Sequence, residues 1–215
     1  MGIPVMVLGE SGTGKSTSLR NLDPNSTLVI QPINKRLPFR TSDWHAWNSE
    51  TKVGQLVHSD NWQYICSVIS AAPSYGKTQI IIDDFQYVMA HEYMRRSDET
   101  GFKKFTEMAN HIWSIVMACE KTPDNVSIYF MQHTETIEGK IKAKTIGKML
   151  DEKITLEGMF SIVFRSIVNS DGEHFFSTKN CGFDTVKTPM DMFSEPLIDN
   201  DLQSIDQTIK QYFGV

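Results

Sequence analysis

The eight residues that read GESGTGKS, from Gly9 to Ser16, constrain the fold of this chain more than any other feature. They match the pattern G-x-x-x-x-G-K-S in full. The short apolar run at 3–8 before them is typical of a buried strand, and residues 15–21 are expected to form a helix. The glycines of the loop permit backbone angles and a close approach that side chains would forbid. The sequence therefore predicts a strand, loop and helix whose backbone N–H groups converge on a phosphate.

This loop gives a specific prediction for nucleotide binding. Lys15 supplies a mobile cation for the β- and γ-phosphates, and Ser16 offers its hydroxyl to Mg²⁺. A chance glycine-rich turn is the alternative, but a Lys-Ser pair after the last glycine adds nothing to an ordinary turn. ATP is the expected nucleotide, because the guanine-selective pattern Asn-Lys-x-Asp is absent from the sequence. The predicted nucleotide-binding residues are Gly9, Glu10, Ser11, Gly12, Thr13, Gly14, Lys15, Ser16 and Thr17.

Two carboxylates, Asp83 and Asp84, follow the apolar run at 79–82. Ligands of open α/β sheets gather at the carboxyl ends of the strands. Asp83 is therefore the expected Mg²⁺ partner, either directly or through water, and Asp84 is the candidate that orients or deprotonates the attacking water. A solvated Asp-Asp turn is the alternative, and the phosphate loop upstream argues against it.

A polar pair, Gln132 and His133, follows the apolar run at 126–131. Either side chain is a candidate sensor of the γ-phosphate, although a Gln-His pair that simply lies at the surface is an equal alternative. The predicted catalytic residues are Lys15, Asp84, Gln132 and His133. The remaining histidines show no metal-ligand spacing and are expected to be structural or exposed; they are His45, His58, His91, His111 and His174.

The order of the expected elements predicts an α/β fold with a mainly parallel central sheet flanked by helices. Further strands are expected at 27–31, 160–168 and 174–178, the last two joined by the turn signal Ser170-Asp171-Gly172 into an antiparallel C-terminal hairpin. Helices are expected at 61–72, 102–120 and 201–212. The chain is expected to form a single domain, 1–215, with an irregular excursion at 32–59, a lysine-rich loop at 138–153, and a C-terminal tail and helix at 194–215.

Composition fits this picture and sets the expected location. The 215 residues are 40% hydrophobic and 22% charged, which suits one medium-sized folded domain. No apolar run approaches the roughly 18 residues that would cross a bilayer, and the N-terminus lacks a basic signal region. The three cysteines, Cys66, Cys119 and Cys181, are odd in number and have no C-x-x-C spacing. They are expected to be free thiols in a reducing cytosol, with no membrane partner.

The three polar elements, in this order and on separate strands, resemble the RecA-like ATPases. More closely, the chain resembles a group of phage-encoded AAA-type P-loop ATPases that includes minimal RecA-core proteins linked to single-strand annealing and phage recombination. The resemblance covers nearly the full length. Besides GESGTGKS and Gln132-His133, it rests on the segments KRLPF (35–39), IIDDFQY (81–87), GKML (147–150) and KTPMDMF (187–193).

The resemblance implies a RecA-like P-loop NTPase core, ATP hydrolysis with Mg²⁺, and action in a host bacterial cytoplasm. Carried over residue by residue, it makes Gly12, Gly14, Lys15 and Ser16 nucleotide ligands and Asp83 the Mg²⁺ carboxylate. It also implies assembly into a homo-oligomer and partners among phage or host recombination or replication proteins.

Two departures from the RecA pattern matter. RecA proteins carry a catalytic glutamate after the strand that follows the P-loop helix, but here that strand ends in Gln31-Pro32-Ile33-Asn34, without an acid. The catalytic role therefore falls to Asp84. The first expected strand begins almost at Met1, so an N-terminal polymerisation segment is not expected, and assembly would use another surface.

The net charge of −5 argues against indiscriminate coating of nucleic acid, yet one segment is locally basic. In a RecA-like core, the expected loop at 138–153 faces the path of DNA. Its lysines would give salt-dependent, sequence-independent binding of single-stranded DNA. The loop has no aromatic side chain for base stacking, and a solvated lysine loop is the alternative. The candidate DNA contacts are Lys140, Lys142, Lys144 and Lys148.

Other basic residues leave alternatives open. Lys179 and Lys187 are candidates for a basic finger that reaches a neighbouring subunit's γ-phosphate, Arg165 is a further one, and exposed lysines near a hairpin are the plain alternative. In the excursion at 32–59, basic and aromatic residues are candidates for binding nucleic acid, for packing a lid or for forming a subunit contact. These residues are Lys35, Arg36, Arg40, Trp44 and Trp47.

Two other functions remain open at this point. The first is a small-molecule phosphotransferase, but Arg95-Arg96 is the only adjacent arginine pair and nothing resembles an arginine-rich lid. The second is a nucleotide-switched binding module that turns over little ATP and acts through another protein.

Overall fold

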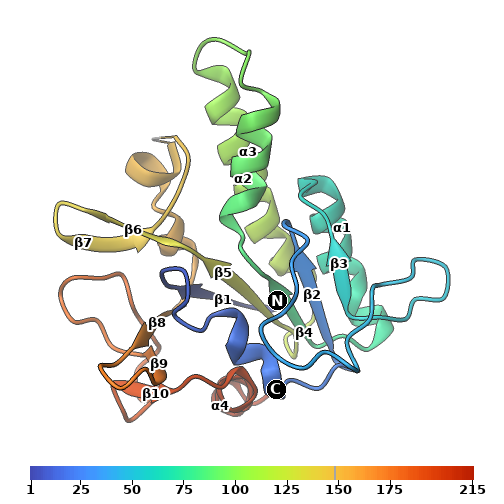
Figure 1. Cartoon of the computed structure of the whole chain (residues 1–215), viewed down its shortest axis with the longest axis vertical. Helices are drawn as coiled ribbons and strands as arrows, with labels where there is room; N and C mark the ends of the chain where they lie inside the picture. Colours follow the sequence, from blue (N-terminus) through green and yellow to red (C-terminus); the bar gives the residue numbers. More distant parts are fainter. Residues whose placement is uncertain (148) are drawn as a thin grey trace.

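The computed structural model describes residues 1–147 and 149–215, and its centre is an eight-stranded sheet (Figure 1). The strand order is β10-β9-β8-β1-β5-β4-β2-β3. Neighbours from β8 to β3 run parallel, whereas β9 is antiparallel to both β8 and β10. The strand bounds are β1 Ile3–Leu8, β2 Thr27–Gln31, β3 Leu56–His58, β4 Gln79–Ile82, β5 Ser127–Gln132, β8 Ile162–Val168, β9 His174–Ser177 and β10 Leu197–Asp199. The predicted α/β fold class, a mainly parallel sheet flanked by helices with a C-terminal antiparallel hairpin, is confirmed.

The central strands are apolar runs because helices cover both faces of the sheet. Even-numbered residues of β1, such as Met6 and Leu8, pack in one apolar cluster, and odd-numbered residues, such as Val5 and Val7, pack in the other. This is the two-residue alternation that a strand imposes on its side chains.

Helices α1 Trp62–Ala71, α2 Gln86–Arg95 and α3 Lys103–Met117 contribute to the first cluster, and α4 Leu202–Phe213 contributes to the second. Figure 1 shows α2 and α3 side by side and extending well beyond the sheet. Within the described residues, short 3₁₀ helices lie at Ser16–Asn21, Ala72–Tyr75, Ala118–Lys121 and Leu156–Met159, and a π-helix lies at Met149–Ile154. No helix in the described part of the chain is long and apolar enough to cross a bilayer.

The position of β5 determines where the site forms. β5 lies between β1 and β4, with Leu8 paired to Gln132 and Ile82 paired to Phe130. The segments that follow these three parallel strands therefore meet at one edge of the sheet, the edge at which open α/β sheets bind ligands. The phosphate loop, the Asp83-Asp84 pair and the Gln132-His133 pair all lie there.

Most expected elements are confirmed. The strands at 3–8, 27–31 and 79–82 have the predicted bounds, and the other long elements agree within a few residues. The helix expected at 15–21 is a 3₁₀ helix at Ser16–Asn21.

The prediction of a lysine-rich loop at 138–153 is wrong at Lys140–Ala143 and Met149–Ile154, which form a strand and a helix. β6 Thr134–Ile137 and β7 Lys140–Ala143 form an antiparallel hairpin, and the π-helix follows it. The turn residues Glu138 and Gly139 have φ of 51° and 78°, the positive values that a tight two-residue hairpin needs. Lys140 and Lys142 therefore lie on a strand, Lys144 follows it, and Lys148 lies outside the described residues.

The predicted irregular excursion and the predicted C-terminal tail each contain a strand that was not expected. The excursion at 32–59 ends in β3, which pairs with β2, and isolated bridges join Ala46 to Leu56 and Asn48 to Val53. The tail at 194–215 contains β10 before α4. Helix α2, which follows Asp84 and Phe85, was not among the expected elements.

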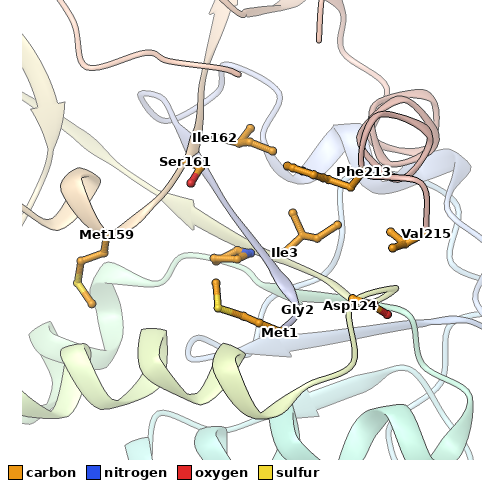
Figure 2. Close-up of a pocket in the computed structure, with 10 residues that line it drawn as sticks. Met1, Gly2, Ile3, Asp124, Met159, Ser161, Ile162, Phe213 and Val215 are labelled. Carbon is orange, nitrogen blue, oxygen red and sulfur yellow. The ribbon is translucent and has the colours of Figure 1, made fainter. Parts of the chain in front are cut away.

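A cavity of about 410 Å³ lies where β1 begins, at the opposite end of that strand from the phosphate loop (Figure 2). Met1, Gly2 and Ile3 line it together with Phe213 and Val215, so the two ends of the chain meet there. The lining is mainly apolar and carries none of the residues predicted to bind nucleotide.

Candidate nucleotide site

The loop from Gly9 to Ser16 has the backbone that its glycines permit. The Gly9 N–H donates to the Gln132 carbonyl at 3.1 Å, which ties the start of the loop to β5. Gly12 and Gly14 have φ of 83° and 95°, values that residues with a side chain rarely adopt. A Cβ atom on Gly14 would also lie 2.8 Å from the His174 Nδ1 atom. At Gly14 the chain therefore needs glycine for both conformation and space.

Two side chains from the C-terminal hairpin support this loop. Ser166 of β8 donates its hydroxyl to the Thr13 carbonyl, and the His174 Nδ1 atom of β9 lies 3.0 Å from the same oxygen. Because a carbonyl only accepts, this contact requires the proton on Nδ1. His174 was expected to be structural or exposed; it is structural, and what it holds is the phosphate loop. Its spacing from the motif in sequence gives no signal of this contact.

Lys15 is almost completely buried, with 6% of its surface exposed. Its Nζ atom donates to the Gly9 and Glu10 carbonyls at 2.7 and 2.8 Å. Burial lowers the pKa of Lys15 to about 8, although the charges of Asp84 and Asp83 act in the opposite direction. The ammonium group is therefore a poorly solvated cation at the phosphate loop, and an anionic ligand there would stabilise its charged form.

Ser16 and Asp83 meet as the sequence predicts for a magnesium site. The Ser16 hydroxyl donates to Asp83 Oδ1 at 2.8 Å. Asp83 is 1% exposed, and its Oδ2 atom has no hydrogen-bond partner among the described residues. Burial, and next the neighbouring charge of Asp84, raise the pKa of Asp83. A buried carboxylate oxygen in need of a partner beside a hydroxyl fits a hard cation such as Mg²⁺.

The rest of the shell would come from phosphate oxygens and water, which is usual for Mg²⁺. Within residues 1–147 and 149–215, no group of three or more His, Cys, Asp or Glu side chains could hold a metal ion by itself.

Asp84 has both carboxylate oxygens engaged. Oδ1 lies 3.3 Å from the His133 Nε2 atom, and Oδ2 accepts a hydrogen bond from the Lys35 ammonium. Burial alone would raise the pKa of Asp84, but the hydrogen bonds from His133 and Lys35 outweigh it and lower the pKa. The residue has φ of 60°, an uncommon conformation for a side chain other than glycine. Asp84 is thus an ionised carboxylate at the site, and its role toward water stays a prediction.

Gln132 is fully buried, so the alternative that it simply lies at the surface is wrong. Its Nε2 atom donates to the Lys144 carbonyl, and its Oε1 atom is unpartnered within the described chain. The backbone N–H of the next residue, His133, donates to Gln86 Oε1 at 3.1 Å. The Gln132-His133 pair therefore connects the site to the β6–β7 hairpin and to α2. Sensing of the γ-phosphate remains untested for both residues.

Lys35 is the site residue whose place the sequence left open. It lies four residues after β2, which is the sheet neighbour of β4. The segment that follows β2 therefore emerges beside the segment that follows β4, and Lys35 reaches the Asp83-Asp84 pair. The segment after β2 has no acid of the RecA pattern and carries the cation Lys35 instead. The β2–β4 pairing was the missing signal, and it follows from topology rather than from any local pattern.

The remaining basic candidates lie in other surroundings. Lys179 donates to the Ser194 carbonyl at 2.8 Å, and Lys187 is exposed on a segment that bridges to β8. Arg165 lies 3.2 Å from Asp184 and lines a cavity of about 300 Å³ together with Gly9, Glu10 and Thr13 of the phosphate loop. The described contacts of Lys179 and Lys187 do not include this loop. A role toward a neighbouring subunit stays a prediction for both.

No protein-family model and no curated protein matches this sequence. Among solved structures, the chain is similar to a KaiC-like protein from the hyperthermophilic archaeon Pyrococcus horikoshii, at 12% sequence identity and a TM-score of 0.49. The match covers 82% of this chain and 77% of that chain.

Proposed function

We propose that this chain is a Mg²⁺-dependent ATPase that binds single-stranded DNA and supports phage DNA recombination or replication as an oligomer. The observation that carries the ATPase proposal is the Ser16–Asp83 hydrogen bond beside a buried Lys15. In phosphoryl transfer, a hydroxyl and a carboxylate hold Mg²⁺ while a cation binds the phosphates. All three kinds of group lie together at the end of this phosphate loop.

Each side chain then has a defined task. Lys15 and the backbone N–H groups of the loop bind the phosphates, and Ser16 and Asp83 would hold Mg²⁺. When bound, Mg²⁺ offsets the charge of the phosphate oxygens. Asp84, ionised and positioned by His133, would orient the attacking water once its other oxygen is released.

The structure weakens the phosphotransferase alternative. Arg95 lies 2.5 Å from Asp60, and Arg96 contacts Glu92, Glu99 and Glu107. The single adjacent arginine pair therefore joins α2 to its neighbours and does not cover the phosphate loop. A screen of nucleosides and nucleotides for phosphate acceptance tests this alternative, and transfer to any of them would contradict the ATPase proposal.

The β6–β7 hairpin supports the DNA part of the proposal. Ile141 of β7 lines the same cavity as Gly9 and Thr13, so the hairpin stands beside the phosphate loop. The Lys144 carbonyl accepts from Gln132, which links the base of the hairpin to the site. Lys140 and Lys144 are exposed, and exposed lysines at this place would contact the phosphates of a single strand.

Single-strand binding is tested with the double variant Lys140→Ala/Lys144→Ala. Each lost phosphate contact lowers the slope of log affinity against log salt by about 0.7, so we expect the slope to fall by about 1.4. Fluorescence anisotropy with a labelled oligothymidylate gives this slope. The control Lys103→Ala/Lys121→Ala removes two exposed lysines elsewhere and should leave it unchanged. Equal slopes in all three proteins, or no binding at low salt, would contradict the DNA proposal.

A further inference from the structure

Lys35 places a second lysine at the phosphate end of the site. Its ammonium donates to Asp84 Oδ2 and lies at ion-pair distance, 3.9 Å, from Asp83 Oδ2, an oxygen with no hydrogen-bond partner in the described chain. The charges of Asp83 and Asp84 therefore have two nearby cations, Lys15 from the phosphate loop and Lys35 from the segment after β2.

The backbone around Lys35 is anchored while its side chain stays half exposed. The Gln31 side chain donates to the Lys35 carbonyl at 3.2 Å, and Leu37, two residues further on, is buried. The Lys35 side chain itself is 41% exposed. A fixed base with a long, partly solvated side chain lets the ammonium exchange one anionic partner for another without a change of fold.

Bound Mg²⁺ and ATP would change the charges that surround the Lys35 ammonium. A divalent cation at Asp83 repels the nearby ammonium, and the terminal phosphate of a nucleoside triphosphate offers it a stronger anionic partner than one carboxylate. Movement of the Lys35 ammonium to the phosphate would also break its hydrogen bond to Asp84 Oδ2, and this oxygen would then be free to accept a hydrogen bond from water.

We propose that Lys35 binds the γ-phosphate of the nucleotide held by its own subunit, and that its release from Asp84 makes this carboxylate available to the attacking water. The inference rests on the proposed ATPase function and assigns a phosphate contact to a residue outside the phosphate loop. Its specific consequence is recognition of the third phosphate, because a diphosphate offers Lys35 no partner in that position.

The test compares the affinities for ATPγS and ADP, measured by titration calorimetry with Mg²⁺. In the wild-type protein, ATPγS should bind more tightly than ADP. Loss of one charge-assisted contact in Lys35→Ala should reduce this preference by about tenfold, with little change in ADP affinity. Lys35→Arg should keep most of the preference. Lys121→Ala, which removes an exposed lysine from another part of the chain, is the control and should equal the wild type.

A second measurement guards against misfolding. Lys35→Met keeps most of the unbranched side chain and removes the ammonium, and its thermal unfolding without nucleotide shows whether the fold survives. If Lys35→Ala and Lys35→Met fold and keep the wild-type ratio of ATPγS to ADP affinity, the inference is wrong. Tighter binding of ATPγS by either variant would also overturn it, because Lys35 would then be a competitor of the ligand.

The failure of this inference can be told apart from failure of the proposed function. If the wild-type protein binds both nucleotides but hydrolyses no ATP, the ATPase proposal and the role of Asp84 toward water fail, while the affinity ratio still decides whether Lys35 binds the γ-phosphate. If the wild-type protein binds neither nucleotide, both proposals fail.

Discussion

Gly14 shows how a single residue ties the C-terminal hairpin to the phosphate loop. Its φ of 95° excludes most side chains, and the His174 ring fills the space that a Cβ atom would need. Gly12 is the natural comparison, because its φ of 83° is similar but the described residues leave open space around it. The two glycines therefore separate a conformational requirement from a steric one.

We expect Gly12→Ala to lower the free energy of unfolding by about 1 kcal/mol, the cost of the left-handed conformation. Gly14→Ala should cost about 1–3 kcal/mol more, because the added methyl group displaces His174. Urea unfolding of both variants, with the double variant Gly14→Ala/His174→Ala, measures the coupling. Equal costs at the two glycines would show that His174 does not restrict Gly14.

At the same scale, the sequence predicted that Ser16 and Asp83 share one Mg²⁺ site, which brings them close together, but it did not predict the surroundings of Asp84. Local patterns identify both residues. Ser16 ends the phosphate-loop motif, and Asp83 is an acid that follows an apolar run. The Lys35–Asp84 and His174–Thr13 contacts join residues 49 and 161 positions apart. Such contacts depend on which strands are neighbours, and no local pattern carries that information.

At the scale of elements, long periodic segments were predictable and short ones were not. α3 has 15 residues with one apolar face, and the three runs at 3–8, 27–31 and 79–82 are continuous and apolar. β3 and β10 have three residues each, too few for a period to show. Their pairing comes from the backbone at the edges of the sheet. β7 was mistaken for part of a loop because it has only four residues, too few for their alternation of lysine with an apolar residue to stand out.

Helix α2 offers a pH test at this scale. Its His91 and Arg95 side chains lie 2.8 and 2.5 Å from Asp60, which precedes α1. Burial would raise the pKa of Asp60, but the hydrogen bonds from Arg95 and His91 outweigh it and lower the pKa below its ordinary value of 3.8. A carboxylate with a lowered pKa stabilises the folded state above its unfolded pKa, and this stabilisation disappears as the pH falls through the folded value.

We therefore expect Asp60→Asn to be less stable than the wild type by about 1 kcal/mol at neutral pH. The difference should shrink as the pH falls below about 4. Denaturant unfolding between pH 3 and 7 measures it. Asp98→Asn, at an exposed position in the α2–α3 connection, is the control and should show no such difference. A difference that stays constant down to pH 3 would exclude the ionised Asp60 as its source.

At the scale of the whole molecule, three segments lie at one edge of a parallel sheet because β5 lies between β1 and β4. They are the phosphate loop, the Asp83-Asp84 pair and the Gln132-His133 pair. The order of the motifs along the chain made the fold class predictable. The local basicity suggested by the sequence is now placed on an ordered hairpin beside the phosphate loop, and Lys35, a further basic residue, contacts Asp84 in the candidate nucleotide site. The net charge of −5 is thus compatible with a binding surface confined to one edge.

Steady-state ATP hydrolysis is the most direct test of the central claim that Lys15, Ser16 and Asp83 form a Mg²⁺-dependent ATPase site. We expect hydrolysis by the wild-type protein that stops when EDTA removes Mg²⁺. In Lys15→Ala it should fall by about 100-fold or more, the typical effect of removing one group that stabilises transition-state charge. Lys103→Ala, which changes an exposed lysine on α3, should retain the wild-type rate. Hydrolysis that survives in Lys15→Ala, or that is absent from the folded wild-type protein with Mg²⁺ present, would contradict this claim.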